Sequence, residues 1–418
     1  MVKENTMKQT EIGLLPEDWN VINLEKNFTL KARIGWQGLT TAEYLDNGNY
    51  GLVTGTDFKG GYIDWDNCVF VEKMRFDQDR NIQLKNGDVL VTKDGTIGKI
   101  AYVDFLPKPT TLNSGVFVVR PKSNSISNRF FYYVLMSFYF DDFLLKITAG
   151  STITHLYQKD FVNFNFVCPP LPEQEAIAEA LSDADAWIES LEQLIAKKRL
   201  IKQGAMQELL TPKEDWEVRK LEDLTKIFTK QTGFDYSAYI KPSLIRIKTD
   251  ETIPFIQNKD FKNKWINLNT DYFIPKSIAL NFPKILLNEK ALLVSISGSV
   301  GNLGVYDLPD LAFIGGAVAI LKFKNPLLID WVSVYLQSDA GQIKLLNNVK
   351  SGSHQNLILD DIRKIEILFP SLTEQTRIAT ILSDMDAELE DLEGQLGKAR
   401  KVKQGMMQEL LTGRVRLV

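Results

Sequence analysis

Few residues of this chain have the types and spacing that covalent chemistry requires. The sequence holds only two histidines, His155 and His354, and two cysteines, Cys68 and Cys168, in unrelated contexts. A metal site needs three or four such ligands together, so neither pair predicts one. The GTIGK run at Gly95 is too short for a phosphate-binding loop, and no dinucleotide fingerprint follows a strand. By elimination, we expect the chain itself to catalyse no reaction.

Other residues suit the recognition of nucleic acid. Arginine and glutamine read base edges, lysine binds phosphates, and glycine or serine loops let backbone N–H groups approach the duplex. In the first half of the chain the candidate contacts are Lys31, Arg33, Trp36, Gln37, Lys93, Lys99, Ser151, Thr152 and His155. In the second half they are Lys230, Gln231, Arg246, Lys248, Gln257, Lys259, Lys350, Ser353, His354 and Gln355. The alternative is that these are ordinary surface loops and connectors, with Trp36 in a core.

Composition sets the limits for these candidates. The chain has 418 residues, 44% of them hydrophobic and 24% charged, which is typical of a globular protein with two to three domains. Its net charge of −4 gives no hint of nucleic acid, because DNA-binding chains are usually basic. The start lacks an apolar signal segment, and the longest aromatic run, residues 130–140, is too short to span a bilayer. We expect a cytoplasmic protein without a membrane partner.

A long repeated segment organises the chain. Residues 171–211 return at 372–412, 201 positions later, and the copies end in KQGAMQELLT and KQGMMQELLT. Both carry apolar residues at alternating steps of four and three, which predicts a coiled-coil seam. The seam positions are Ile177, Leu181, Ala184, Ile188, Leu191, Ile195, Ile378, Leu382, Met385, Leu389, Leu392 and Leu396. We expect each helix to pair with its own copy; the alternative is an ordinary two-helix hairpin.

The two segments before these helices also correspond. Asp57-Phe58 matches Asp260-Phe261, and the glycines of DGTIGKIAYV match those of SGSVGNLGVY. GDVLVTKDGTIGKIAYV predicts a hairpin or a barrel edge, VFVVRP a strand, and FFYYVLMSF one clear, buried helix. For the two halves to be equivalent, the tail TGRVRLV must lie close to residues 11–19. The molecule would then be pseudo-cyclic, with its two long helices antiparallel.

These observations give an α+β fold class. Two mixed α/β domains are expected to be separated by two long antiparallel coiled-coil helices with pseudo-two-fold, circular symmetry. The expected boundaries are 1–170 for the first domain, 171–212 for the first helix, 213–370 for the second domain, and 371–418 for the second helix and tail.

The whole chain resembles the specificity subunit of type I restriction-modification systems. The resemblance rests on PPLPEQEAIAEAL and PSLTEQTRIATIL at the helix starts, and on KQGAMQELLT and KQGMMQELLTGRVRL at the helix ends. IGLLPEDW and KARIGWQGLTTAEY add to it. It implies a non-catalytic subunit with two target recognition domains. Each would read one half of a split site in double-stranded DNA, with an unread spacer set by the paired helices.

The resemblance also implies partners and their cofactors. Two adenine-N6 methyltransferase subunits would bring S-adenosylmethionine, and restriction subunits would use ATP and Mg²⁺, while this chain binds no cofactor. Because the two domains differ in sequence, the half-sites should differ. We expect the helices, with their KQG–MQELLT ends, to dock the methyltransferase. Two alternatives remain open from the residues: a stand-alone coiled-coil DNA-binding regulator, and a protein scaffold.

Overall fold

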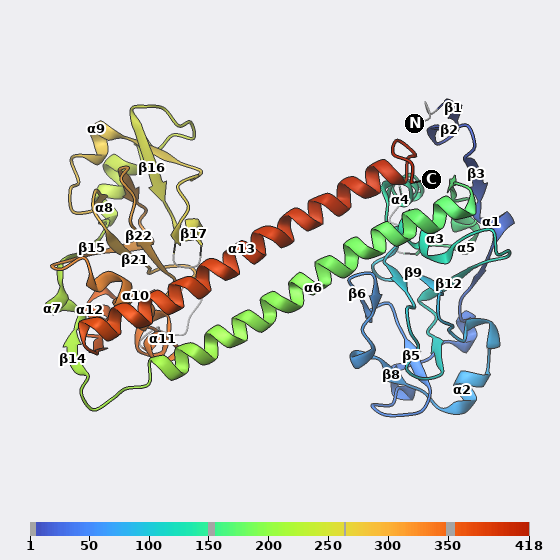
Figure 1. Ribbon diagram of the computed structural model, residues 1–418, viewed down its shortest axis with the longest axis horizontal. Coiled ribbons are helices and arrows are strands. Elements are labelled where there is room, and N and C mark those ends of the chain that lie inside the picture. The colour runs from blue at the N-terminus through green and yellow to red at the C-terminus, as the bar shows by residue number, and fades with distance from the viewer. Residues whose placement is uncertain (1–5, 149–154, 263–264, 348–355, 418) are drawn as a thin grey trace. The chain divides into compact units, whose positions relative to one another are not determined.

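The computed structural model of the chain describes residues 6–148, 155–262, 265–347 and 356–417, which fold as two compact units. Unit 1 comprises Met1–Glu192 and Gly394–Val418, and unit 2 comprises Gln193–Glu393. Each unit contains a globular head and part of both long helices, α6 (Leu171–Leu209) and α13 (Leu372–Leu410) (Figure 1). The division therefore cuts through the helices, whereas the boundaries expected from the repeat lie at their ends.

Head 1, the part of unit 1 that precedes α6, is built on two sheets. The larger has the strand order β4-β12-β9-β10-β7-β6 and the smaller the order β11-β5-β8. The strands of the larger sheet are β4 (Phe28–Lys31), β12 (Val116–Pro121), β9 (Val89–Thr92), β10 (Ile100–Tyr102), β7 (Tyr62–Ile63) and β6 (Phe58–Lys59). The smaller sheet contains β11 (Thr110–Leu112), β5 (Gly51–Val53) and β8 (Val69–Phe70). Two antiparallel pairs complete the strands, β1 (Met7–Thr10) with β2 (Gly13–Pro16) and β3 (Asn20–Asn23) with β13 (Asn165–Cys168).

Head 2 repeats this plan. Its larger sheet has the order β15-β24-β21-β22-β18-β17, and its smaller sheet the order β19-β16-β23-β20. The larger sheet contains β15 (Thr225–Lys230), β24 (Val318–Phe323), β21 (Ala291–Ser295), β22 (Leu303–Tyr306), β18 (Trp265–Ile266) and β17 (Phe261–Lys262). The smaller contains β19 (Phe273–Pro275), β16 (Thr252–Ile256), β23 (Ala312–Ile314) and β20 (Leu286–Leu287). β14 (Glu217–Lys220) pairs with β25 (Glu366–Phe369) as β3 does with β13.

Short helices cover the sheets. In head 1 they are α1 (Leu24–Asn27), α2 (Lys73–Asp77), α3 (Asn128–Leu135), α4 (Phe138–Thr148) and α5 (Gln158–Phe161). In head 2 they are α7 (Leu221–Leu224), α8 (Gly233–Asp235), α9 (Lys276–Ala279), α10 (Leu328–Gln337), α11 (Asp339–Leu346) and α12 (Leu359–Arg363). The aromatic run expected to form one helix forms two, α3 and α4, which are separated at Met136 and Ser137; the Ser137 hydroxyl donates to Val134 O at 2.6 Å. Residues Phe130–Leu135 are buried, as predicted.

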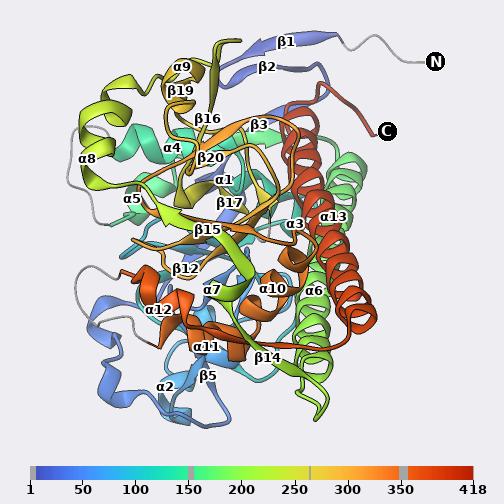
Figure 2. The ribbon, with the colours of Figure 1, turned by 90° about the vertical axis from the view of Figure 1, so that its left-hand side faces the viewer.

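Each head shares its core with the long helices. The unit 1 core includes Ile177 and Leu181 from the start of α6 and Leu410 and Leu411 from the end of α13. In unit 2, α10 packs between the larger sheet and α13 (Figure 2), and Leu210, directly after α6, joins the same core. Neither core is therefore made by one contiguous repeat.

The two helices pack antiparallel within each unit. Leu191 and Ile195 are 6% and 4% exposed, and most seam positions on both helices are buried; Ile188, Met385 and Leu396 are half-buried. Equivalent ion pairs, related by the 201-residue repeat, flank the seam in both units. They are Lys403–Asp185 and Arg400–Glu192 in unit 1, and Lys202–Asp386 and Arg199–Glu393 in unit 2.

The tail closes unit 1 beside the first strands. Arg416 donates to Asp18 Oδ1 and Oδ2 at 3.0 and 2.7 Å and to Glu173 Oε2 at 2.7 Å. The indole N–H of Trp19 donates to the same Glu173 oxygen at 2.9 Å, and both Trp19 and Glu173 are fully buried. This confirms the predicted proximity of the tail to residues 11–19.

Replacing Arg416 with alanine should destabilise unit 1 by about 3 kcal/mol, because it leaves the buried Glu173 carboxylate without its cation. Urea unfolding of the full chain measures the loss. The matched control is Arg414→Ala. Its Nη1 lies 3.4 Å from Glu409 Oε1, and both side chains are exposed, so this change should cost under about 0.5 kcal/mol. Equal losses for both variants would contradict a special role for Arg416.

The free energy that this junction contributes to folding should depend on pH. Hydrogen bonds from Arg416 hold the pKa of Asp18 below its usual 3.8. A lowered carboxylate pKa stabilises the fold above the unfolded value and loses that stability as the pH falls through the folded value. Between pH 5 and about pH 2, the unfolding free energy of the Arg416→Ala variant should therefore fall less than that of the unchanged chain.

Candidate nucleic-acid interface

Several loops of head 1 converge at one edge of its larger sheet. The N–H of Lys93 donates to Gly115 O at 2.9 Å, and the N–H of Leu156 donates to Lys93 O at 2.7 Å. His155 Nδ1 lies 2.6 Å from Asp94 Oδ1. A hollow of about 270 Å³ opens here, lined also by Arg33. Sequence candidates from three separate segments therefore meet at one place.

A glycine turn between β9 and β10 forms part of this edge. Thr92 Oγ1 donates to Thr96 O at 2.6 Å and accepts from the N–H of Lys99 at 2.9 Å. Gly95 and Gly98 have φ angles of 70° and 78°, which side chains other than glycine rarely adopt. A Cβ on Gly98 would also lie 2.4 Å from Leu144 Cδ1. The turn is thus fixed, and it presents the exposed Lys99 side chain.

Head 2 builds the same turn from different residues. Ser295 Oγ donates to Ser299 O at 2.6 Å and accepts from the N–H of Asn302 at 2.8 Å. Gly298 and Gly301 have φ angles of 78° and 85°. Asn302 therefore occupies the position of Lys99, on the same backbone framework. The match between these turns that the sequence predicted is confirmed.

Arg33, the sequence candidate for base reading in head 1, is instead a buried framework residue. It is 1% exposed, and its Nε donates to Leu112 O at 2.8 Å. Its Nη2 donates to Thr111 Oγ1 at 3.1 Å and its Nη1 to Gln78 Oε1 at 3.1 Å. Burial lowers the pKa of Arg33, so these acceptors are needed to hold the charge inside the head. A side chain so engaged does not reach DNA.

Gln231 of head 2 occupies the same place as Arg33. Lys31 pairs with Val118 across β4 and β12, and Thr229 pairs with Ile320, the equivalent of Val118, across β15 and β24. Arg33 and Gln231 follow two residues later in the chain, beyond the ends of β4 and β15. Gln231 is 4% exposed and donates to Ile314 O, the equivalent of Leu112 O. The prediction of DNA contacts is therefore corrected for both residues, since each supports the smaller sheet.

The other candidates of head 1 lie in varied settings. Lys31 and Lys99 are exposed, His155 is exposed beside Asp94, and Lys93 is half-buried with its amine 5.5 Å from the Phe117 ring. Gln37 is half-buried in a 3-10 turn, Gly35–Gln37. The side chain of Trp36 and residues Ser151 and Thr152 lie outside the described residues.

In head 2, Lys230, Arg246 and Lys248 are exposed, and the Arg246 guanidinium lies 5.5 Å from the Tyr272 ring. Lys259 is ion-paired with Asp271. Gln257 is half-buried, and its N–H donates to Asp260 Oδ2 at 2.7 Å, as the N–H of Thr54 does to Asp57. The candidates Lys350, Ser353, His354 and Gln355 lie outside the described residues.

Sequence reasoning missed several exposed apolar side chains near these loops. Ile34 and Tyr157 line the hollow of head 1 and are 53% and 50% exposed. Phe234 and Tyr239 of head 2 are 70% and 53% exposed. The strand register of the structure reveals the equivalence, because it aligns Gly35-Trp36 with Gly233-Phe234.

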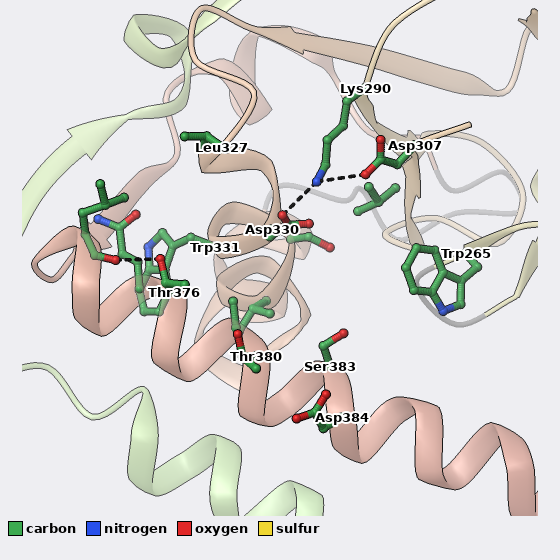
Figure 3. Close-up of a pocket in the computed structure, with 16 residues that line it drawn as sticks. Trp265, Lys290, Asp307, Leu327, Asp330, Trp331, Thr376, Thr380, Ser383 and Asp384 are labelled. Atoms are coloured by element: carbon green, nitrogen blue, oxygen red, sulfur yellow. Dashed lines mark hydrogen bonds and ion pairs between the residues drawn. The ribbon is translucent and has the colours of Figure 1, made fainter. Parts of the chain in front are cut away.

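A second hollow in head 2 has the wrong charge for DNA. It has a volume of about 460 Å³ and lies between α10 and the first half of α13 (Figure 3). The amine of Lys290 lies 2.8 Å from Asp330 Oδ2 and 3.2 Å from Asp307 Oδ2. Asp384 adds a third carboxylate. Three carboxylates against one amine repel phosphates, so this groove is not the DNA-binding site.

The described residues give little support to a reactive cysteine, a metal site or a membrane-spanning helix. Burial raises the pKa of the Cys68 thiol to about 12 and that of Cys168 to about 11, so neither supplies a thiolate nucleophile near neutral pH. Across the described ranges, no three His, Cys, Asp or Glu side chains group to hold a metal ion. In the same ranges, no helix combines the length and apolar character that crossing a membrane requires.

Comparison with known proteins places this geometry in context. The family model described as "Type I restriction modification DNA specificity domain" matches twice, over residues 16–198 and 213–398. The type I restriction enzyme MjaVIII specificity subunit of Methanocaldococcus jannaschii is 25% identical over 445 residues, covering 99% of this chain and 97% of the relative. The EcoKI specificity subunit of Escherichia coli K12 is 23% identical over 420 residues, covering 96% and 89%. The crystal structure of the type I system S subunit from M. genitalium shares the fold, with a TM-score of 0.61 at 16% identity, covering 94% of this chain and 96% of that one.

The burial of Arg33 predicts a stability defect in the Arg33→Ala variant. Removing this side chain leaves Leu112 O and Thr111 Oγ1 without their buried donor, so head 1 should lose about 2–3 kcal/mol. Urea unfolding measures the loss. Lys31→Ala, two residues away on the exposed side of the strand, is the control and should change stability by under about 0.5 kcal/mol. An Arg33→Ala protein of unchanged stability would return Arg33 to the DNA candidates.

Proposed function

Because this chain belongs to the type I restriction-modification DNA specificity family, we propose that each head reads one half of an asymmetric, bipartite DNA target. Two tandem specificity domains, over residues 16–198 and 213–398, make it a specificity subunit with two target recognition domains. That assignment favours the DNA-reading function over a stand-alone regulator or a scaffold.

One observation carries the proposal. The two heads share a loop framework but differ at the positions that the framework presents. Thr92 and Ser295 hold their glycine turns through the same pair of hydrogen bonds. At the tips, head 1 has Lys99 and His155 where head 2 has Asn302 and Asn356. Different donors and acceptors on one scaffold suit two different half-sites.

The long helices are proposed to set the spacer and to dock two adenine-N6 methyltransferase subunits. Those subunits would bring S-adenosylmethionine, and restriction subunits would add ATP and Mg²⁺. One solved neighbour comes from a structural study of complex assembly in the type I R-M system. The apolar residues of the KQG–MQELLT ends, such as Met206 and Met406, already pack against the heads. We therefore propose that docking uses the faces of the helices that stay exposed.

Methylation mapping tests the half-site assignment. The chain is co-expressed with a type I methyltransferase from its own locus, and adenine methylation on host DNA is read by long-read sequencing. One bipartite motif with an unspecified gap is expected. Exchanging residues 17–170 for another recognition domain should change one half of the motif and leave the other. A change in both halves, or a continuous motif, would refute the assignment.

Charge reversal tests the docking surface. Asp183 and Asp384 are repeat-related, exposed residues of α6 and α13. The double variant Asp183→Lys, Asp384→Lys should lose co-purification with the methyltransferase. The control is Glu72→Lys, an exposed residue of head 1 that lies next to α2 rather than to either long helix (Figure 1). Retained co-purification of the double variant would count against docking by the helices.

A further inference from the structure

The strand register identifies an aromatic residue at the same place in both heads. Arg33 and Gln231 occupy equivalent positions and donate to equivalent carbonyl groups, those of Leu112 and Ile314. The chain then makes one short helical turn in each head, Gly35–Gln37 in head 1 and α8 in head 2. The second residue of that turn is Trp36 in head 1 and Phe234 in head 2.

In head 2 this turn is held in place while its aromatic ring lies in solvent. Thr232 Oγ1 accepts from the N–H of Asp235 at 3.0 Å and donates to Asp235 Oδ2 at 2.6 Å. The Phe234 ring is nevertheless 70% exposed. It contacts Tyr239, itself 53% exposed, with ring centroids 6.0 Å apart and nearly perpendicular planes. Tyr239 in turn lies 6.4 Å from Phe282. The two exposed rings form an ordered apolar surface.

The charge around these rings identifies the kind of partner. Residues 230–248 contain four cations and one carboxylate, Asp235, a net charge of +3 in a chain whose total is −4. The cations are Lys230, Lys241, Arg246 and Lys248, all exposed. An apolar pair inside a basic segment matches duplex DNA, which offers phosphates beside base edges and thymine methyl groups.

We propose that Phe234, supported by Tyr239, contacts the bases of the half-site that head 2 reads, and that Lys241 and its neighbouring cations bind the flanking phosphates. This inference rests on the proposed function, and it names the residues by which head 2 performs it. The predicted contact is apolar, so it would select a base by its methyl group or shape rather than by hydrogen bonds.

The test uses the intact complex with the methyltransferase. Phe234→Ala should relax the methylation motif at one position of a single half-site and weaken binding to the target duplex about tenfold or more. Lys241→Ala should weaken binding for all sequences alike and lower the slope of log affinity against log salt by about one. The control is Leu327→Ala, which removes an equally exposed apolar side chain (71%) at the acidic groove, and it should change neither motif nor affinity.

The outcomes distinguish a failure of the Phe234 contact from a failure of the proposed bipartite reading. Each variant is first shown to co-elute with the methyltransferase and to unfold at an unchanged temperature, which the exposure of Phe234 leads us to expect. An unchanged motif and affinity in Phe234→Ala would overturn this inference and leave the bipartite reading intact. A complex of the unchanged chain that methylates no bipartite motif would overturn both.

Discussion

The buried carboxylate of Glu173 joins three distant parts of unit 1. It lies at the start of α6, accepts from Trp19 near the beginning of the chain, and is neutralised by Arg416 near its end. A fully buried charge is tolerable only when paired and hydrogen-bonded. Leu410 and Leu411, a few residues before Arg416, pack into the unit 1 core. Unit 2 has a looser counterpart, in which Lys213, 58% exposed, pairs with Glu374. Head 1 therefore depends strongly on the C-terminal tail for its closure. Head 2 depends less on the segment between α6 and β14 that contains Lys213.

The long helices add a second constraint, which concerns register more than stability. Exposed ion pairs such as Arg400–Glu192 contribute little energy in water. This pair nevertheless recurs in the other unit with the repeat-related residues, Arg199 and Glu393, and Lys403–Asp185 recurs as Lys202–Asp386. Sliding one helix by a turn would break both sets of pairs and move the seam residues out of contact. The charges thus select one antiparallel alignment, and the apolar seam supplies the energy that holds it.

Most of the architecture could be predicted from periodicity and repetition, because both depend on residue spacing alone. The heptads, the glycine turns at Gly98 and Gly301, and the closure by the tail could all be predicted from spacing. The roles of Arg33 and Gln231 could not. A polar residue in a glycine-flanked loop looks the same whether its side chain faces a buried carbonyl group or solvent. Phe234 was missed for the converse reason: an aromatic residue suggests a core, and only the strand register and its exposure show otherwise.

The split composition of unit 1 sets an unusual order of events during synthesis. Unit 2 is one contiguous stretch, Gln193–Glu393, whereas unit 1 also needs Gly394–Val418. Ribosomes add about 5–20 residues per second, so head 1, complete near residue 170, waits roughly 10–50 s for the last residues to be made. Throughout that interval the face of Trp19 that later meets Gly413 has no cover from the tail. The head that is translated second can therefore finish folding first, while this face of head 1 stays uncovered until the tail is made.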